Sequence, residues 1–129
     1  MTHTNSLKPT TLVVSVGGSL VVPNGGVDHD FLKELKKIVK KHVKLGWKFV
    51  IVVGGGGTAR QYQEAARKVG ALTREDLDWL GIHSTRLNGH LVRTVFREIA
   101  HPVMIKDPTR APKRWNKPVM VAAGWKPGW

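Results

Sequence analysis

The sequence predicts an α/β fold built on a parallel β-sheet, and three observations lead to this expectation. Apolar runs rich in β-branched residues, at 11–16, 48–53 and 119–123, are typical of strands buried on both faces. Segments with one apolar side at helical spacing separate these runs. Each run is followed by glycine, at once or within a residue. Strands that alternate with helices imply right-handed crossovers and a three-layer sandwich with helices on both faces of the sheet.

Composition narrows the class of protein. At 129 residues with 41% hydrophobic residues, the chain is long enough for one domain with a core and too apolar for a disordered one. Cysteine is absent, which excludes disulfides and thiolate chemistry. No apolar run approaches the roughly 20 residues of a membrane span, and the polar start lacks the apolar segment of a signal peptide. We therefore expect a cytoplasmic protein without a membrane partner.

The charge is strongly positive, because 21 Lys and Arg oppose 9 Asp and Glu, for a formal net charge of +12. Such a surface attracts polyanions. Six lysines fall on one side of a single predicted helix, which favours an ordinary solvated face; they are Lys33, Lys36, Lys37, Lys40, Lys41 and Lys44. A second cluster surrounds Trp115 in a proline-broken loop and is the better candidate for contact with a polyanion; it comprises Lys106, Arg110, Lys113, Arg114 and Lys117.

The first half of the chain reads in order as follows. A flexible leader at 1–10 precedes the strand at 11–16, a glycine turn, and a short extended piece at 20–22. Asp28 or Asp30 is placed to cap a helix that runs to about residue 45, and Gly46 is placed to end it. The strand at 48–53 follows.

The second half begins with a helix from Thr58 to about Gly70. Thr73 and Asp76 have the spacing of a capping box, so a new helical segment starts there, with a bend at Gly81. A further helix is expected at 84–99, then a short strand at 103–105, the basic loop at 106–117 and the last strand at 119–123.

The four glycines at 54–57 are the strongest candidate for a ligand site. They connect a buried strand to a helix, and glycine lets the backbone come close to a phosphate while the helix start presents its N–H groups. Arg60, in the first turn of that helix, is placed for a bidentate phosphate contact. The alternative is a tight turn with nothing bound. Four glycines cost more chain entropy than a turn requires, which favours the ligand site.

Four segments carry a resemblance to a known family. The first turn reads Val-Ser-Val-Gly-Gly-Ser at 14–19, and the second reads Val-Gly-Gly-Gly-Gly-Thr-Ala-Arg at 53–60. Between the helices lies Gly-Ile-His-Ser-Thr-Arg-Leu-Asn at 81–88, and Gly-Trp-Lys-Pro-Gly follows the last strand at 124–128. In this order and spacing the segments resemble the amino acid kinase superfamily, most closely the archaeal type of uridylate kinase, over nearly the whole chain from residue 11.

The resemblance implies an activity and its residues. Such kinases transfer the γ-phosphoryl group of ATP to UMP with Mg²⁺ in pyrimidine nucleotide biosynthesis, and they assemble into dimers or hexamers. By resemblance, the ATP and phosphate contacts fall on Gly17, Gly18, Ser19, Gly56 and Arg60. The UMP contacts fall on Gly55, Asp78, Trp125, Lys126, Pro127 and Gly128. No residue of the chain is assigned to metal.

Simpler roles compete for some of these residues. Asp78 is equally consistent with a solvated helix carboxylate. For Arg86 we favour a structural ion pair, and His83 receives no role.

The sequence departs from the family at two positions. Ser15 stands where many relatives have a lysine that offsets charge on the transferring phosphoryl group, and Gly57 stands at another position often held by lysine. Neither can supply a charge, so the catalytic residue is left unassigned. Lys126 is a candidate replacement.

The family pattern also continues beyond this sequence. Residues 11–129 correspond to the acceptor-binding portion, and the ATP-binding half is absent, so we expect the chain alone to be inactive and to self-associate through an exposed sheet edge and apolar faces. Two alternatives stay open. One is a kinase for another small phosphate or acid, such as isopentenyl phosphate or an N-acylated amino acid. The other is a non-catalytic basic module that binds RNA or a nucleotide.

Overall fold

The fold is a three-stranded parallel sheet with helices, as a computed structural model of residues 10–24 and 26–128 shows. The strands lie in the order β1 (Thr11–Val16), β2 (Lys48–Val53) and β3 (Val119–Ala122). Both pairs are parallel, with Val14 opposite Ile51 and Ile51 opposite Val121. The predicted α/β class with a parallel sheet is confirmed. The predicted leader at 1–10 lies outside the described residues except for its last position.

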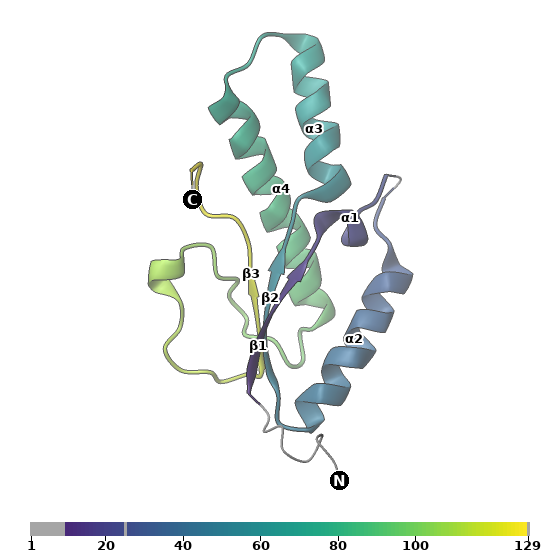
Figure 1. Ribbon diagram of the computed structural model, residues 1–129, viewed down its shortest axis with the longest axis vertical. Helices are drawn as coiled ribbons and strands as arrows, with labels where there is room; N and C mark the ends of the chain where they lie inside the picture. Colours follow the sequence, from purple (N-terminus) through teal and green to yellow (C-terminus); the bar gives the residue numbers. More distant parts are fainter. Residues whose placement is uncertain (1–9, 25, 129) are drawn as a thin grey trace.

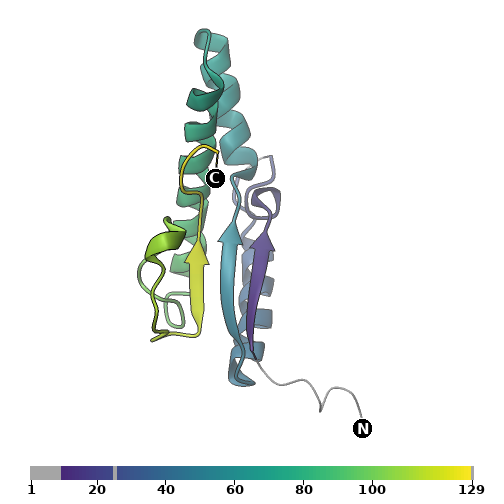
Figure 2. The ribbon, with the colours of Figure 1, turned by 60° about the vertical axis from the view of Figure 1, so that its left-hand side comes forward.

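Two long helices cover one face of the sheet. These are α2 (His29–Lys44) and α4 (Arg74–Val95), which lie together behind the strands in Figure 2. A single turn, α1 (Gly18–Val21), follows β1. The hairpin of α3 (Gly56–Val69) and the first half of α4 extends beyond the carboxyl ends of the strands (Figure 1). A short 3-10 helix, η2 (Pro108–Arg110), lies in the basic loop.

The core forms between the sheet and these two helices. Alternate residues of β2, Phe49, Ile51 and Val53, are buried in one cluster with residues such as Leu32 of α2 and Phe96, which follows the end of α4. The opposite face is partly open: Val13 is 70% exposed. Within the described residues no helix covers that face, so the second helical layer of the expected three-layer sandwich is not part of this structure.

The predicted helix boundaries hold where a side chain caps the helix. The Asp28 carboxylate accepts a hydrogen bond from the Phe31 N–H at 3.0 Å and begins α2. Gly46 follows that helix with a φ of 95°, a conformation that glycine adopts without strain. The capping box of α4 is present, with both hydrogen bonds between Thr73 and Asp76 at 3.1 Å.

Four predictions about local structure were wrong. Leu20 and Val21 are helical and not extended, because hydrogen bonds from Leu20 N–H to Gly17 O and from Val22 N–H to Gly18 O close the turn α1, which ends before Val22. Helix α3 begins two residues before Thr58, within the glycines. Helix α4 runs through Gly81 without a break and ends at Val95.

The fourth error is the strand expected at 103–105, where the chain makes one isolated bridge, between Ile105 and Ala122. The glycine at 81 has a packing role, since a Cβ there would lie 3.2 Å from the Gln63 side chain of α3. Among the described helices, none combines the length and apolarity that crossing a membrane requires.

Candidate functional site

Three glycine-containing loops meet at the carboxyl end of the sheet, because all three strands run in the same direction. The first two loops touch backbone to backbone. A Cβ on Gly18 would lie 2.6 Å from the carbonyl carbons of both Gly54 and Gly55. Only glycine permits this approach, so the turns after β1 and β2 form one unit.

The backbone of the second loop leaves two N–H groups without acceptors. The Gly54 N–H donates to Val16 O at 3.2 Å and the Gly57 N–H donates to Val22 O at 2.8 Å. Those of Gly55 and Gly56, which lie between them, donate to no group among the described residues. They sit at the N-terminus of α3, where the helix dipole favours negative charge, so this backbone has the geometry of an anion site.

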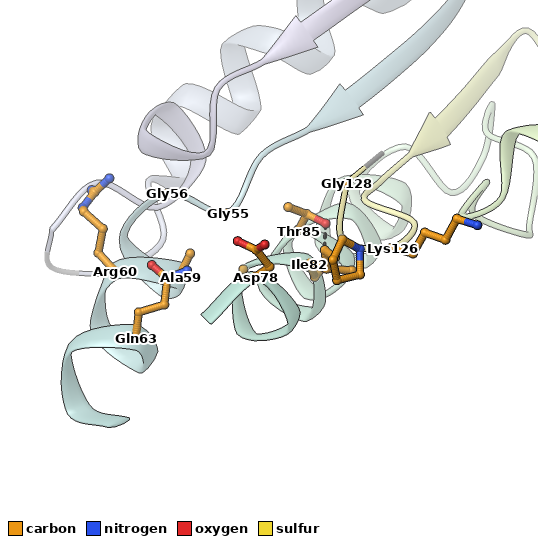
Figure 3. Close-up of a pocket in the computed structure, with 12 residues that line it drawn as sticks. Gly55, Gly56, Ala59, Arg60, Gln63, Asp78, Ile82, Thr85, Lys126 and Gly128 are labelled. Carbon is orange, nitrogen blue, oxygen red and sulfur yellow. Dashed lines mark hydrogen bonds between the residues drawn. The ribbon is translucent and has the colours of Figure 1, made fainter. Parts of the chain in front are cut away.

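A cleft of about 590 Å³ opens beside this loop, between α3, α4 and the loop after β3 (Figure 3). Its walls include many of the residues expected from the sequence, namely Gly55, Gly56, Arg60, Asp78, Lys126, Pro127 and Gly128, together with Ala59, Gln63, Gly81, Ile82 and Thr85. The fold therefore brings together one glycine loop, one carboxylate and the last loop, which lie far apart in the sequence.

Four expected site residues do not line the cleft. Gly18 is buried against the second glycine loop, and the exposed Gly17 precedes it. Ser19 is connected to the cleft through Arg60, whose guanidinium donates to Ser19 Oγ at 3.1 Å and to Asn24 Oδ1 at 3.2 Å. Trp125 contributes its ring to the last loop, with Lys126 Nζ 4.3 Å from the ring centroid.

The charged groups are arranged unevenly around the cleft. The half-buried Asp78 places its carboxylate at the centre, below Gly55, and it is the one acidic residue in the lining (Figure 3). Arg60 extends toward the first loop, and the Lys126 ammonium is directed away from Asp78. The cation nearest the glycine loops is thus Arg60.

Sequence reasoning missed the polar residues that hold these loops. Arg86 forms no ion pair in the described structure, contrary to our expectation; it donates to Gly124 O at 3.1 Å and Trp125 O at 2.6 Å. Asn88, only 2% exposed, donates to Gly54 O and Gly55 O at 3.0 Å each. Both belong to the Thr-Arg-Leu-Asn segment at 85–88. Its resemblance to the family was the feature of the sequence that could have pointed to these two residues.

Comparison with known proteins gives a consistent result. Residues 10–122 match the model of the amino acid kinase family. The chain is 40% identical over 98 residues to a uridylate kinase of Methanocorpusculum labreanum, which covers 76% of this chain and 40% of that protein. It is 35% identical over 125 residues to a uridylate kinase of Thermococcus kodakarensis, which covers 91% of this chain and 51% of that protein.

The structure agrees with these matches. The crystal structure of uridylate kinase from Archaeoglobus fulgidus superposes with a TM-score of 0.76 at 30% identity, over 94% of this chain and 52% of that one. The chain therefore spans about half the length of the proteins that it resembles.

Proposed function

The chain belongs to the amino acid kinase family, and on that basis we propose that it forms the acceptor-binding portion of a uridylate kinase. The reaction is transfer of the γ-phosphoryl group of ATP to UMP, giving UDP for pyrimidine nucleotide biosynthesis. The observation that carries the proposal is the cleft in which the glycine loop, Asp78 and the loop after β3 converge. We propose that residues 1–129 alone bind the acceptor without turning it over.

The glycine loops are proposed to hold the phosphates. Phosphoryl transfer depends mainly on positioning and charge stabilisation, which the N–H groups of Gly55 and Gly56 and the start of α3 supply without a nucleophilic side chain. The residues proposed for ATP and the transferring phosphoryl group are Gly17, Gly18, Ser19, Gly56 and Arg60. Since Arg60 already bridges to Ser19 and Asn24, its orientation is set before the anion arrives.

The opposite side of the cleft is proposed to hold UMP. Asp78 lies in the cleft at a distance from the first loop, where its carboxylate accepts hydrogen bonds from the sugar hydroxyls. Gly55 contacts the nucleotide from one side, and Trp125, Lys126, Pro127 and Gly128 contact it from the other.

The proposed reaction uses Mg²⁺ with ATP. The described residues contain no cluster of three or more His, Asp or Glu side chains placed to hold a metal ion, and Asp78 is the only carboxylate lining the cleft. Mg²⁺ is commonly bound through substrate phosphates and water with only one or two carboxylates. We propose that it enters with ATP, and we assign no step to it.

The exposed cationic loop supports a second candidate function. Lys106, Arg110, Lys113 and Arg114 are all exposed there, and Lys48 Nζ lies 5.5 Å from the ring centroid of the half-buried Trp115. Cations beside an aromatic ring are typical of surfaces that bind single-stranded nucleic acid. A nucleic-acid-binding module of the same fold would show RNA affinity that falls steeply with salt and no preference for UMP.

Nucleotide binding by the full chain distinguishes these functions. UMP should raise the melting temperature, and CMP and AMP should raise it less, because a ligand that binds only the folded state stabilises it. Asp78→Asn should weaken UMP binding by about tenfold or more, since it removes a charge-assisted hydrogen bond. The exposed Glu75→Gln, in the first turn of the same helix, is the matched control. Equal stabilisation by all three nucleotides would contradict the uridylate kinase assignment.

A further inference from the structure

One segment of α4 holds both walls of the cleft. Thr85, Arg86 and Asn88, which we call the α4 clamp, form hydrogen bonds to backbone groups of two loops that are about 70 residues apart in the sequence. Asn88 contacts the loop after β2, and the other two residues contact the loop after β3. The clamp is the only set of side chains in the described structure that bonds to both loops.

Asn88 helps to fix the direction of the glycine peptides, together with the Ala59 N–H of α3, which donates to Gly55 O at 3.1 Å. In a trans peptide the C=O and the following N–H point in opposite directions. Because Asn88 Nδ2 holds the carbonyls of Gly54 and Gly55 at 3.0 Å each, the N–H groups of Gly55 and Gly56 face away from Asn88. Asn88 Oδ1 is itself held by the Thr58 hydroxyl of α3 at 3.3 Å. The side chain therefore cannot rotate without losing contacts on both sides.

Thr85 and Arg86 fix the other wall in the same manner. The Thr85 hydroxyl accepts a hydrogen bond from the Gly124 N–H at 2.8 Å and donates to Ile82 O at 2.6 Å. The Arg86 guanidinium donates to the carbonyls of Gly124 and Trp125. The Gly124 N–H and the carbonyls of Gly124 and Trp125 are thus all hydrogen-bonded to α4. These contacts fix the direction in which the loop continues from β3.

We propose that the α4 clamp sets the separation and orientation of the two walls, so that Asn88 and Arg86 are positioning residues for nucleotide binding. The ligand in this inference rests on the proposed function, but the clamp itself does not. Turning the glycine carbonyls toward Asn88 keeps their negative ends away from an incoming phosphate and leaves the N–H groups for it. The bound anion then contacts a loop whose orientation needs no rearrangement.

The test combines backbone amide spectra with nucleotide titration of the ¹⁵N-labelled full chain. Asn88→Ala should shift the amide signals of residues 54–57, and Arg86→Lys should shift those of Gly124 and Trp125. Asn88→Asp keeps an oxygen that can accept from the Thr58 hydroxyl but loses the N–H donors to Gly54 O and Gly55 O. This variant replaces Asn88→Ala in the test if the alanine variant does not fold. Ser84→Ala is the matched control, because its buried hydroxyl bonds only to Leu80 O within α4.

Binding separates positioning from general stability. Measured well below each melting temperature, the Kd for UMP should rise about tenfold or more in Asn88→Ala and Asn88→Asp, and less in Arg86→Lys, with no change in Ser84→Ala. Unchanged amide signals at 54–57 in both Asn88 variants would overturn the clamp. Shifted signals with an unchanged Kd would overturn its role in binding. If the wild-type chain binds no nucleotide, the proposed function fails, and the amide signals still decide whether the clamp exists.

Discussion

Two adjacent glycines provide a sharp test of the contact between the first two loops. Gly17 and Gly18 differ in what a methyl group would meet: nothing lies within 4 Å of a Cβ on Gly17, whereas a Cβ on Gly18 would lie 2.6 Å from two backbone carbonyl carbons. Ordinary carbon contacts are about 3.5–4.0 Å, so the loops must move apart by about 1 Å in Gly18→Ala. Backbone atoms cannot rotate away as a side chain can.

The expected cost follows from this overlap. Overpacking in a close-packed region costs about 1–3 kcal/mol, and backbone on both sides places Gly18→Ala at the upper end of that range. Gly17 has a φ of −57°, which alanine adopts readily, so Gly17→Ala should stabilise the chain by about 0.4–1 kcal/mol through the unfolded state. The free energies of unfolding of the two variants should therefore differ by about 3.4–4 kcal/mol.

Urea unfolding followed by far-UV circular dichroism measures both variants, and nucleotide titration shows whether the site is affected. Gly18→Ala should also weaken nucleotide binding, because the displaced atoms belong to the loop that carries the Gly55 and Gly56 N–H groups. Equal stability of the two variants would refute the close backbone contact, and the account of the joined loops with it.

Three further outcomes are expected. Lys126→Ala should reduce the salt dependence of UMP binding, since it removes the cation among the proposed UMP contacts; an unchanged dependence would contradict that contact. The Lys36 hydrogen bond holds the pKa of the Glu98 carboxyl below its ordinary value of 4.5, so its contribution to stability is present above pH 4.5 and is lost as the pH falls through the lower folded value. Glu98→Gln should flatten that part of the acid unfolding curve, and an unchanged curve would contradict the pairing. Val13→Lys should reduce self-association of the chain in sedimentation experiments, because Val13 is 70% exposed on the open sheet face; a wild-type chain that sediments as a monomer would contradict this.

The sequence predicted best what local chemistry determines. Strand β1 was placed to the residue because its apolar run ends at glycine. Thr73 was correctly identified as a cap, and Asp28 was one of the two candidates for the other cap, because such side chains satisfy N–H groups a few positions away. The parallel order required only the alternation of strands and helices. These features depend on residues that are close together in the sequence, so the sequence pattern is enough to predict them.

The wrong predictions concern segments whose structure depends on contacts with residues far away in the sequence. Gly81 suggested a break, but α3 packs against that position and the helix continues through it. Residues 103–105 have the composition of a strand, yet they make a single isolated bridge to β3, through Ile105. Likewise, nothing local to Arg86 shows that its partners are the carbonyls of Gly124 and Trp125, because those partners depend on how the loop after β3 folds back.

Contacts between distant residues also explain why position 57, which the family resemblance associates with lysine, is a glycine in this chain. A Cβ on Gly57 would lie 2.8 Å from Val22 O and still closer to Pro23 O, so this backbone accepts no side chain at that position. In the proposed phosphate site, a cation would then come from a residue that reaches the first loop from outside the turn. Arg60 does so, because its guanidinium is bonded to Ser19 and Asn24 and still has further N–H groups to donate. Under the proposed function, the close packing of the glycine loops and the use of Arg60 for the phosphates are thus two consequences of one arrangement.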